Sequence, residues 1–268
     1  MDRRSQEIER IRAAYRERDA AGPAASSPWL DRGYRFHLQQ IEWALLDGLD
    51  AAGIELNAAR VAEVGCGAGY FLSRFLDYGA GRASGIDLME DRVALARERD
   101  PRLELVAGDA SELPWEDETF EVVSQFTCLS SVLDPEVRRA IASEMWRVLA
   151  PGGALVSYDV RPDPAPIRAL RRLAALRGGA EASSGTPIAP VRISELTSWF
   201  GEPLLVRRVG VYPELASRLA RAPLLAQLAA RCPGLQVHLL AVATKPGPAA
   251  PGRGGPGARS PGVDRPSP

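Results

Sequence analysis

Two stretches near the amino terminus place apolar residues at every third or fourth position, which is the spacing of one helix face. Residues 3–20 carry Ile8, Ile11 and Tyr15 among arginines and glutamates, and residues 34–53 continue the pattern over a longer run. The segment GPAASSP at 22–28 separates the two and is rich in helix breakers. Residues 1–57 are therefore predicted to form a helical cap of two amphipathic helices.

From residue 60 onward, short apolar runs alternate with helical segments. Strands are predicted at 60–65, 82–87, 103–106, 120–125 and 154–159, with helices at about 69–78, 91–99 and 135–149. This βαβ order builds a parallel sheet with right-handed crossovers. Two later strands, at 204–211 and 235–244, would complete the sheet. We expect a Rossmann-like α/β domain over 58–245, with a seven-stranded, mostly parallel sheet and helices on both faces.

The segments around the last strands are less regular. Residues 166–177, rich in Ala and Arg, predict a solvated helix, with binding of an anionic substrate as the alternative. Residues 178–190 predict a loop, and residues 194–200 a short helix with Ser194 as its N-cap. The stretch 214–230 predicts a helix whose leucines pack against the sheet, with contact of its Leu-rich face to a membrane surface or a lipid-linked substrate as the alternative. More than half of residues 246–268 are proline or glycine, which predicts a disordered tail that catalysis does not need.

Charge and cysteine content narrow the possible partners. The chain has 33 basic and 34 acidic residues mixed along its length, so no excess of positive charge indicates nucleic-acid binding. No apolar run approaches membrane-spanning length, and charges fill the first twenty residues, which predicts a cytoplasmic protein without stable membrane insertion. Cys66, Cys128 and Cys232 lie far apart without metal-ligand spacing, so we expect reduced, buried thiols and no metal site.

The segment VAEVGCGAGY at 61–70 predicts a ligand site between a strand and a helix. Glycines at 65, 67 and 69 let the backbone turn sharply and approach a ligand, and the following helix offers free N–H groups. Dinucleotide sites use Gly-x-Gly-x-x-Gly, whereas Tyr70 stands here at the third glycine position. Glu63 would repel phosphates but suits the ammonium of a bound amino acid. A structural turn without ligand is the alternative.

Two more carboxylates follow predicted strands. Asp87 ends the second strand, where it could accept both hydroxyls of a ribose or cap the helix that follows. Asp109 follows the third strand, where it could accept an adenine amino group or be a solvated turn residue. Because parallel strands end at one edge of the sheet, we expect both near the glycine turn.

In order, the segments EVGCGAG, GIDL, GDASELPW, FEVVSQ and RVLAPGGALV resemble the class I S-adenosylmethionine-dependent methyltransferase family, in its small-molecule, methyltransferase type 11-like branch, over residues 58–160. The resemblance implies S-adenosylmethionine as cofactor, N-terminal helices that cover it, and a structural turn at 151–153. It implies that the glycine loop with Glu63 holds the methionine part, Asp87 the ribose, and Asp109 with Ala110 the adenine. Gln125 and Thr127 would line the methionine end. The expected site is completed by Tyr34, Gly65, Cys66, Gly67, Gly69 and Leu88.

The resemblance does not identify the residues that bind the methyl acceptor. The family aligns a nucleophile with a sulfonium methyl, and a hydroxyl acceptor also needs a base. His37, on the second predicted helix, is the candidate base, with a surface or capping role as the alternative. His238, in an apolar strand, is expected to be a satisfied core residue, and Asp159 and Arg161 are either site or solvated loop residues.

The expected activity is methyl transfer to an oxygen, or to a nitrogen, of a small metabolite such as a sugar or secondary metabolite. One alternative is a nicotinamide-dependent oxidoreductase, which Tyr70 and Glu63 disfavour. The other is a non-catalytic binding module with the same fold, which the three carboxylates disfavour.

Overall fold

The computed structural model describes residues 2–20, 32–176, 187–201, 204–211, 219 and 222–247. The predicted linker at 22–28, most of the predicted loop at 178–190 and the predicted tail from residue 248 onward lie outside this part.

Seven strands form one sheet in the order β3-β2-β1-β4-β5-β7-β6. They are β1 (Arg60–Val64), β2 (Arg82–Asp87), β3 (Glu104–Ala107), β4 (Phe120–Phe126), β5 (Leu149–Val160), β6 (Leu204–Val211) and β7 (Gln236–Thr244). The first five pair in parallel, and β7 inserts antiparallel between β5 and β6. Because both faces of the central strands are covered, they read as continuous apolar runs. The predicted fold class is confirmed.

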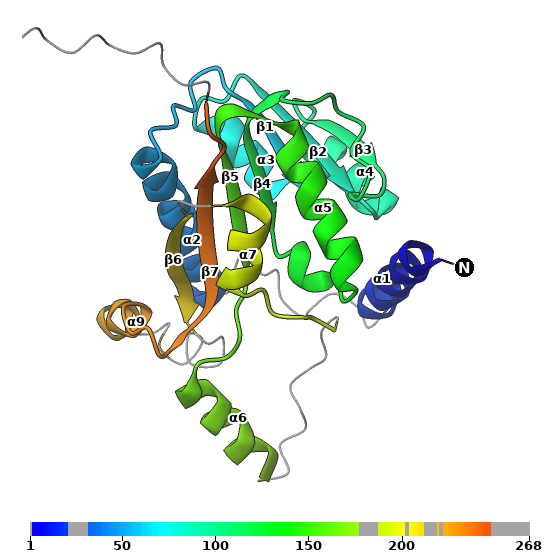
Figure 1. The fold of residues 1–268 in the computed structure, drawn as a ribbon. Helices are drawn as coiled ribbons and strands as arrows, with labels where there is room; N and C mark the ends of the chain where they lie inside the picture. Colours follow the sequence, from blue (N-terminus) through cyan, green and yellow to red (C-terminus); the bar gives the residue numbers. More distant parts are fainter. Residues whose placement is uncertain are drawn as a thin grey trace, which may run out of the picture.

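Helices cover both faces of this sheet (Figure 1). The described helices are α1 (Arg3–Ala20), α2 (Arg32–Ala51), α3 (Tyr70–Asp77), α4 (Glu90–Arg99), α5 (Pro135–Val148), α6 (Ala165–Leu176), α7 (Ile193–Phe200) and α9 (Pro223–Ala230), of which α6 extends away from the sheet. One core cluster joins α2 and α3 to one face, through Leu45, Phe75 and Val156. A second cluster joins α5 and α7 to the other face, through Met145, Leu155 and Leu196.

Two local predictions were wrong. The fifth strand begins at Leu149 and includes residues 151–153, where the register shifts, so Pro-Gly-Gly is an irregularity inside the strand rather than a turn before it. Ser194 is not the N-cap of α7. The N-cap is Arg192, whose backbone N–H donates to the Glu195 carboxylate at 2.9 Å. The Glu195 carboxylate, at the third residue of the helix, thus satisfies the backbone N–H of the N-cap residue, as the glutamate of a capping box does.

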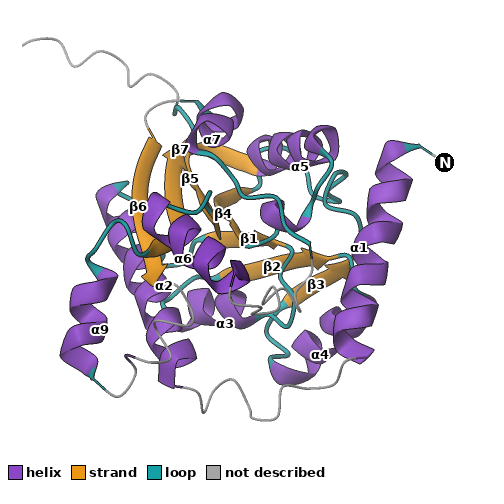
Figure 2. Ribbon diagram, turned by 90° about the horizontal axis from the view of Figure 1, so that it is seen from below, coloured by secondary structure: helices purple, strands orange, loops and turns teal. Residues whose placement is uncertain are grey.

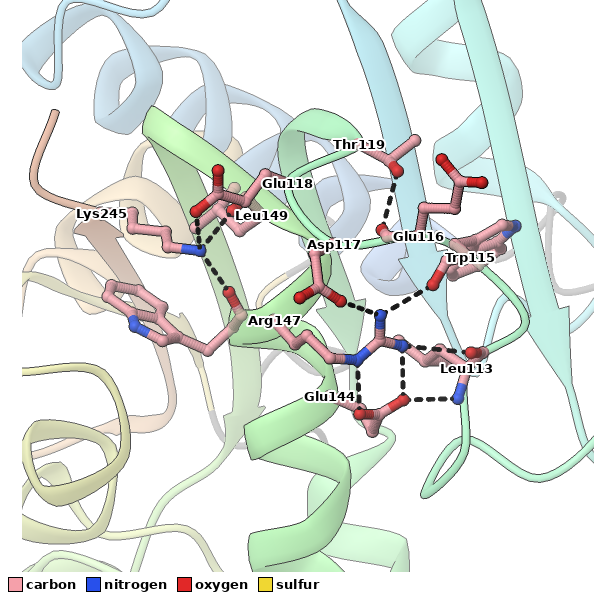
Figure 3. Close-up of polar contacts among 11 residues, drawn as sticks. Leu113, Trp115, Glu116, Asp117, Glu118, Thr119, Glu144, Arg147, Leu149 and Lys245 are labelled. Carbon is pink, nitrogen blue, oxygen red and sulfur yellow. Dashed lines mark hydrogen bonds and ion pairs between the residues drawn. The ribbon is translucent and has the colours of Figure 1, made fainter. Parts of the chain in front are cut away.

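At the edge of the sheet where β5 begins, one arginine organises the connection from β3 to β4 (Figure 3). Arg147 donates to both oxygens of Glu144 at 2.7 Å, and also to the backbone oxygens of Leu113 and Trp115. Glu144 in turn accepts the backbone N–H of Leu113 at 2.8 Å. These bidentate, charge-assisted bonds fix the connection whose first residues include Asp109.

Candidate functional site

A cavity of about 670 Å³ lies at the carboxyl edge of the parallel strands. Its lining follows the sheet order: Asp109 after β3, Asp87 at the end of β2, the glycine loop after β1, Thr127 after β4, and Tyr158 near the end of β5. The helices α1 and α2 close it from opposite ends, and Figure 2 shows α1 beside the ends of β2 and β3. The predicted convergence at one edge is therefore present.

The glycine loop takes its shape from left-handed backbone at Gly65 and Gly67, whose φ values are 71° and 51°. A Cβ at Gly65 would lie 2.8 Å from the Cys128 Sγ, so only glycine fits between the two loops. A Cβ at Gly67 would meet nothing within 4 Å. The Gly67 backbone thus faces open cavity, as a ligand-binding loop requires.

The Glu63 side chain reaches this cavity as a buried carboxylate, one oxygen of which has no hydrogen-bond partner within the described residues. Its side chain is fully buried, and within the described residues its Oε2 has no hydrogen-bond partner. Burial, reinforced by the neighbouring Asp87 charge, raises the pKa of Glu63 well above its usual range. An unpartnered buried carboxylate is costly, and a cationic ligand group would relieve that cost.

Asp87 and Asp109 are held by backbone donors and keep acceptor capacity. Asp87 accepts the Gly67 N–H at 2.8 Å and the Met89 N–H at 2.9 Å, one on each oxygen. Asp109 accepts the N–H and hydroxyl of Ser111, and Arg4 of α1 donates to it as well. A carboxylate offers about four lone-pair sites, so Asp87 keeps two and Asp109 keeps one.

Three rings gather where α2 meets the ends of β5 and β7. The His37 Nε2 lies 2.9 Å from the Tyr158 hydroxyl, and the His238 ring stacks on Tyr158 with centroids 5.1 Å apart. Gly210 of β6 lets the backbone come this close, because a Cβ there would lie 2.6 Å from the His37 ring.

These rings stay uncharged near neutral pH. Burial lowers the pKa of His37 to about 4 and, with His37 beside it, that of His238 to about 3. Burial raises the pKa of Tyr158 well above its usual range. His238 is not the satisfied core residue that the sequence predicted, since its buried Nδ1 has no partner in the described part of the chain.

Comparison with known proteins fits this arrangement. Residues 61–153 match the family model of a methyltransferase domain. The chain is 40% identical to a phthiotriol/phenolphthiotriol dimycocerosates methyltransferase of Mycobacterium ulcerans, over 42% of this chain and 41% of that protein. It is 37% identical to a fatty-acid O-methyltransferase of Mycolicibacterium smegmatis, over 42% and 41% of the two chains. The match thus spans about two fifths of the length of these curated relatives.

Solved structures agree with the fold. A magnesium protoporphyrin IX methyltransferase of Synechocystis PCC 6803, with bound SAH, superposes with a TM-score of 0.56 at 16% identity, covering 90% of this chain and 95% of that one. A Mesorhizobium loti S-adenosylmethionine-dependent methyltransferase gives 0.51 at 22% identity, covering 75% and 97%.

The chain carries a class I S-adenosylmethionine-dependent methyltransferase domain.

Most predicted site residues of this methyltransferase domain line the cavity, and two do not. Tyr34, His37, Glu63, Gly65, Cys66, Gly67, Asp87, Leu88, Asp109, Ala110 and Thr127 line it. Gln125 and Gly69 are absent from the lining. Gln125 is fully buried. Its side-chain amide donates to the Ser157 hydroxyl and the Asp159 carboxylate, and its amide oxygen accepts the backbone N–H of Cys128. Gly69, with φ 76°, precedes the first residue of α3.

The same network removes Asp159 from the candidate site residues of the methyltransferase domain. Asp159 accepts from Gln125 at 2.7 Å and from the Ser130 N–H at 3.1 Å, and burial raises its pKa to about 6. It shapes the loop after β4 rather than the cavity wall. The expectation that all three cysteines are buried was also wrong, because Cys232 is exposed while Cys66 is buried and Cys128 partly so.

Sequence reasoning missed three residues that the fold brings to the methyltransferase site. Tyr158 was read as an apolar strand residue, Gly210 was not singled out, and Arg4 was one of many arginines in α1. Only Gly210 gave a signal, since a glycine inside an apolar strand often marks a close approach.

Proposed function

We propose that this chain transfers the methyl group of S-adenosylmethionine to the hydroxyl oxygen of an apolar, lipid-like small molecule. The observation that carries the proposal is a single cavity with the carboxylates and glycine loop at one end, an uncharged His37–Tyr158 pair at the other, and apolar side chains between.

The residues present suit the cofactor. The unpartnered Glu63 oxygen would take the ammonium group of the methionine part. The two open acceptor sites of Asp87 match the two ribose hydroxyls, and the remaining site of Asp109 matches one adenine amino hydrogen. When bound, the cofactor supplies an electrophilic methyl on a sulfonium sulfur.

An apolar acceptor is favoured over the sugar considered from the sequence. Ile8 and Ile11 of α1 and Leu38 and Ile41 of α2 line the cavity. Phe71 and Phe126 stack in its wall with ring centroids 3.7 Å apart. A sugar would leave its hydroxyls unpaired against such a wall, whereas a hydrocarbon chain gains from it. The two mycobacterial relatives named above act, by their names, on lipids, which supports the same choice.

His37 is proposed as the general base, with Tyr158 as its neighbour in the hydrogen-bonded pair. As the acceptor oxygen forms its bond to the methyl carbon and the carbon–sulfur bond breaks, the hydroxyl proton must leave. The neutral His37 ring would receive it on Nδ1, while its Nε2–H donates to the Tyr158 hydroxyl at 2.9 Å and so holds the ring in place. The helix α1 limits water at the other end of the cavity through its apolar side chains.

Binding and turnover test different parts of this proposal. Titration calorimetry is expected to show binding of S-adenosylmethionine and S-adenosylhomocysteine and none of NAD. Long-chain hydroxy acids and fatty alcohols, offered as acceptors with labelled cofactor, are expected to become methylated, and a free sugar is not. Tight NAD binding, or methylation of the sugar alone, would contradict the proposal.

The base is tested with a matched pair of variants on α2. His37→Ala is expected to lower the methylation rate about 100-fold while cofactor affinity stays nearly the same. Arg35→Ala, at an exposed position two residues earlier, is the control and is expected to keep both. An unchanged rate in His37→Ala removes His37 from the reaction.

A further inference from the structure

The outer face of α9 is made of exposed leucines. Leu224, Leu225 and Leu228 are 76%, 55% and 63% exposed, while Ala226 on the inner side is buried. The sequence-based expectation that the leucines of this region pack against the sheet is wrong for these three. Burying them elsewhere would gain free energy, since each is a large apolar side chain left in water.

The neighbouring helix α6 adds positive charge to this apolar surface. Arg168, Arg171 and Arg172 of α6 are exposed, and Leu173 beside them is 51% exposed. Asp163 pairs with Arg171 at 3.1 Å, and no other acidic residue occurs in the sequence before Glu181, nor from 215 to 247. The whole chain has a formal net charge of −1, so this concentration of basic residues is local.

Topology places both helices at the edge of the sheet that holds the cavity. The helix α6 follows the carboxyl end of β5, and α9 precedes β7, which runs antiparallel to β5 and so starts at that same edge. The turn after α9 touches α6, because a Cβ on Gly234 would lie 3.4 Å from the Pro166 Cγ. Figure 1 shows α6 and α9 at the same end of the molecule, with α6 extending away from the sheet.

We propose that α6 and α9 form a docking surface for an anionic phospholipid membrane. Leucines that enter the interface, flanked by arginines that meet lipid phosphates, are the two contacts a peripheral membrane protein uses. A second copy of the chain fits less well, because a symmetric contact would set the arginines of one copy against those of the other. In the described residues, no helix is both long and apolar enough to cross a bilayer, so the contact is peripheral.

Docking at this edge would turn the cavity toward the bilayer. That consequence, delivery of a lipid-like acceptor from the membrane, rests on the proposed function. The docking itself needs neither cofactor nor acceptor, so it is measured separately.

The test is flotation of the full chain with vesicles of phosphatidylcholine alone or of equal parts phosphatidylcholine and phosphatidylglycerol. We expect binding to the anionic vesicles that weakens with salt, and little binding to the neutral ones. Replacing Leu224, Leu225 and Leu228 together by serine should lower the partition coefficient at least about tenfold. Arg172→Gln, and Arg231→Gln at the exposed residue that follows α9, should lower it about fivefold each.

A matched control uses apolar residues exposed elsewhere. Trp43 and Leu46 of α2 are 75% and 37% exposed, and replacing both by serine should leave vesicle binding unchanged. Circular dichroism and the thermal midpoint verify folding of every variant. Absence of binding to anionic vesicles, or equal loss in the α2 control, overturns the proposal. So does a dimer in solution that the leucine variant dissociates, because the leucines would then be covered by a second copy. Vesicle binding without S-adenosylmethionine binding would instead refute the proposed function and leave the docking surface standing.

Discussion

Replacing Glu63 by glutamine should make the cofactor-free protein more stable and its cofactor binding weaker. Glu63 is fully buried, its Oε2 is unpartnered within the described chain, and the Asp87 carboxylate lies close enough to raise its pKa further. The native state therefore holds this carboxylate at a cost that the unfolded chain, where it is hydrated, does not have.

The sign of the pH effect follows from the direction of the shift. Because the folded pKa of Glu63 lies above its ordinary value of 4.5, the native state binds more protons than the unfolded chain. The contribution of the Glu63 side chain to stability is complete below pH 4.5, and it is lost as pH rises toward the folded pKa. Each pH unit between 4.5 and the folded pKa removes up to about 1.4 kcal/mol of this contribution.

Glutamine removes the charge but leaves a buried amide without a full set of partners, which costs about 1 to 2 kcal/mol. The net change in free energy of unfolding at pH 7 is the loss accumulated up to that pH less the cost of the amide, and we expect it to be a gain. For a chain of this size, each kcal/mol of gain raises the thermal midpoint by roughly 2 to 4 °C. Affinity for S-adenosylmethionine should fall by about 1.5 to 3 kcal/mol, because the charge-assisted bond to the ammonium is lost.

Urea unfolding at pH 5 and pH 7 and calorimetric titration of the cofactor measure both quantities. The variant should lose less stability than the wild type between the two pH values. The reasoning is refuted if Glu63→Gln is less stable than the wild type at pH 7, or if its cofactor affinity is unchanged. Glu55→Gln, with an exposed carboxylate before β1, is the control and should alter neither quantity appreciably.

Three further predictions concern the glycines and the base. Gly65→Ala combines left-handed backbone with a 2.8 Å clash against Cys128, so it should unfold at lower urea than Gly67→Ala, which has the backbone strain alone. Equal midpoints would contradict the clash. Gly210→Ala should push the His37 ring and slow methylation more than it weakens cofactor binding, whereas parallel losses would indicate general unfolding. Since burial lowers the pKa of His37 to about 4, kcat/KM should decline only below about pH 5, and an acid limb near 6.5 would show an ordinary, solvated histidine.

Local sequence patterns determined the elements and the cofactor side of the site. The alternation of strands and helices, the glycine loop and the carboxylates at strand ends are encoded in contiguous residues, because period and spacing depend only on near neighbours. Parallel strands then end at one edge whatever their exact register, which is why Glu63, Asp87 and Asp109 converge as the sequence indicated.

Tertiary structure alone decided which side chains face the cavity. Successive strand residues point to opposite faces, so Tyr158 meets His37 under α2, while Ser157 and Asp159 bind Gln125 on the other side. When both faces of a strand are buried, its apolar sequence does not show which residues point to which face of the sheet. Likewise, Arg4 donates to Asp109, which lies more than a hundred residues away in the sequence. The α9 leucines stay exposed because no described segment packs over them. Such contacts depend on how whole helices dock, and no local pattern records that.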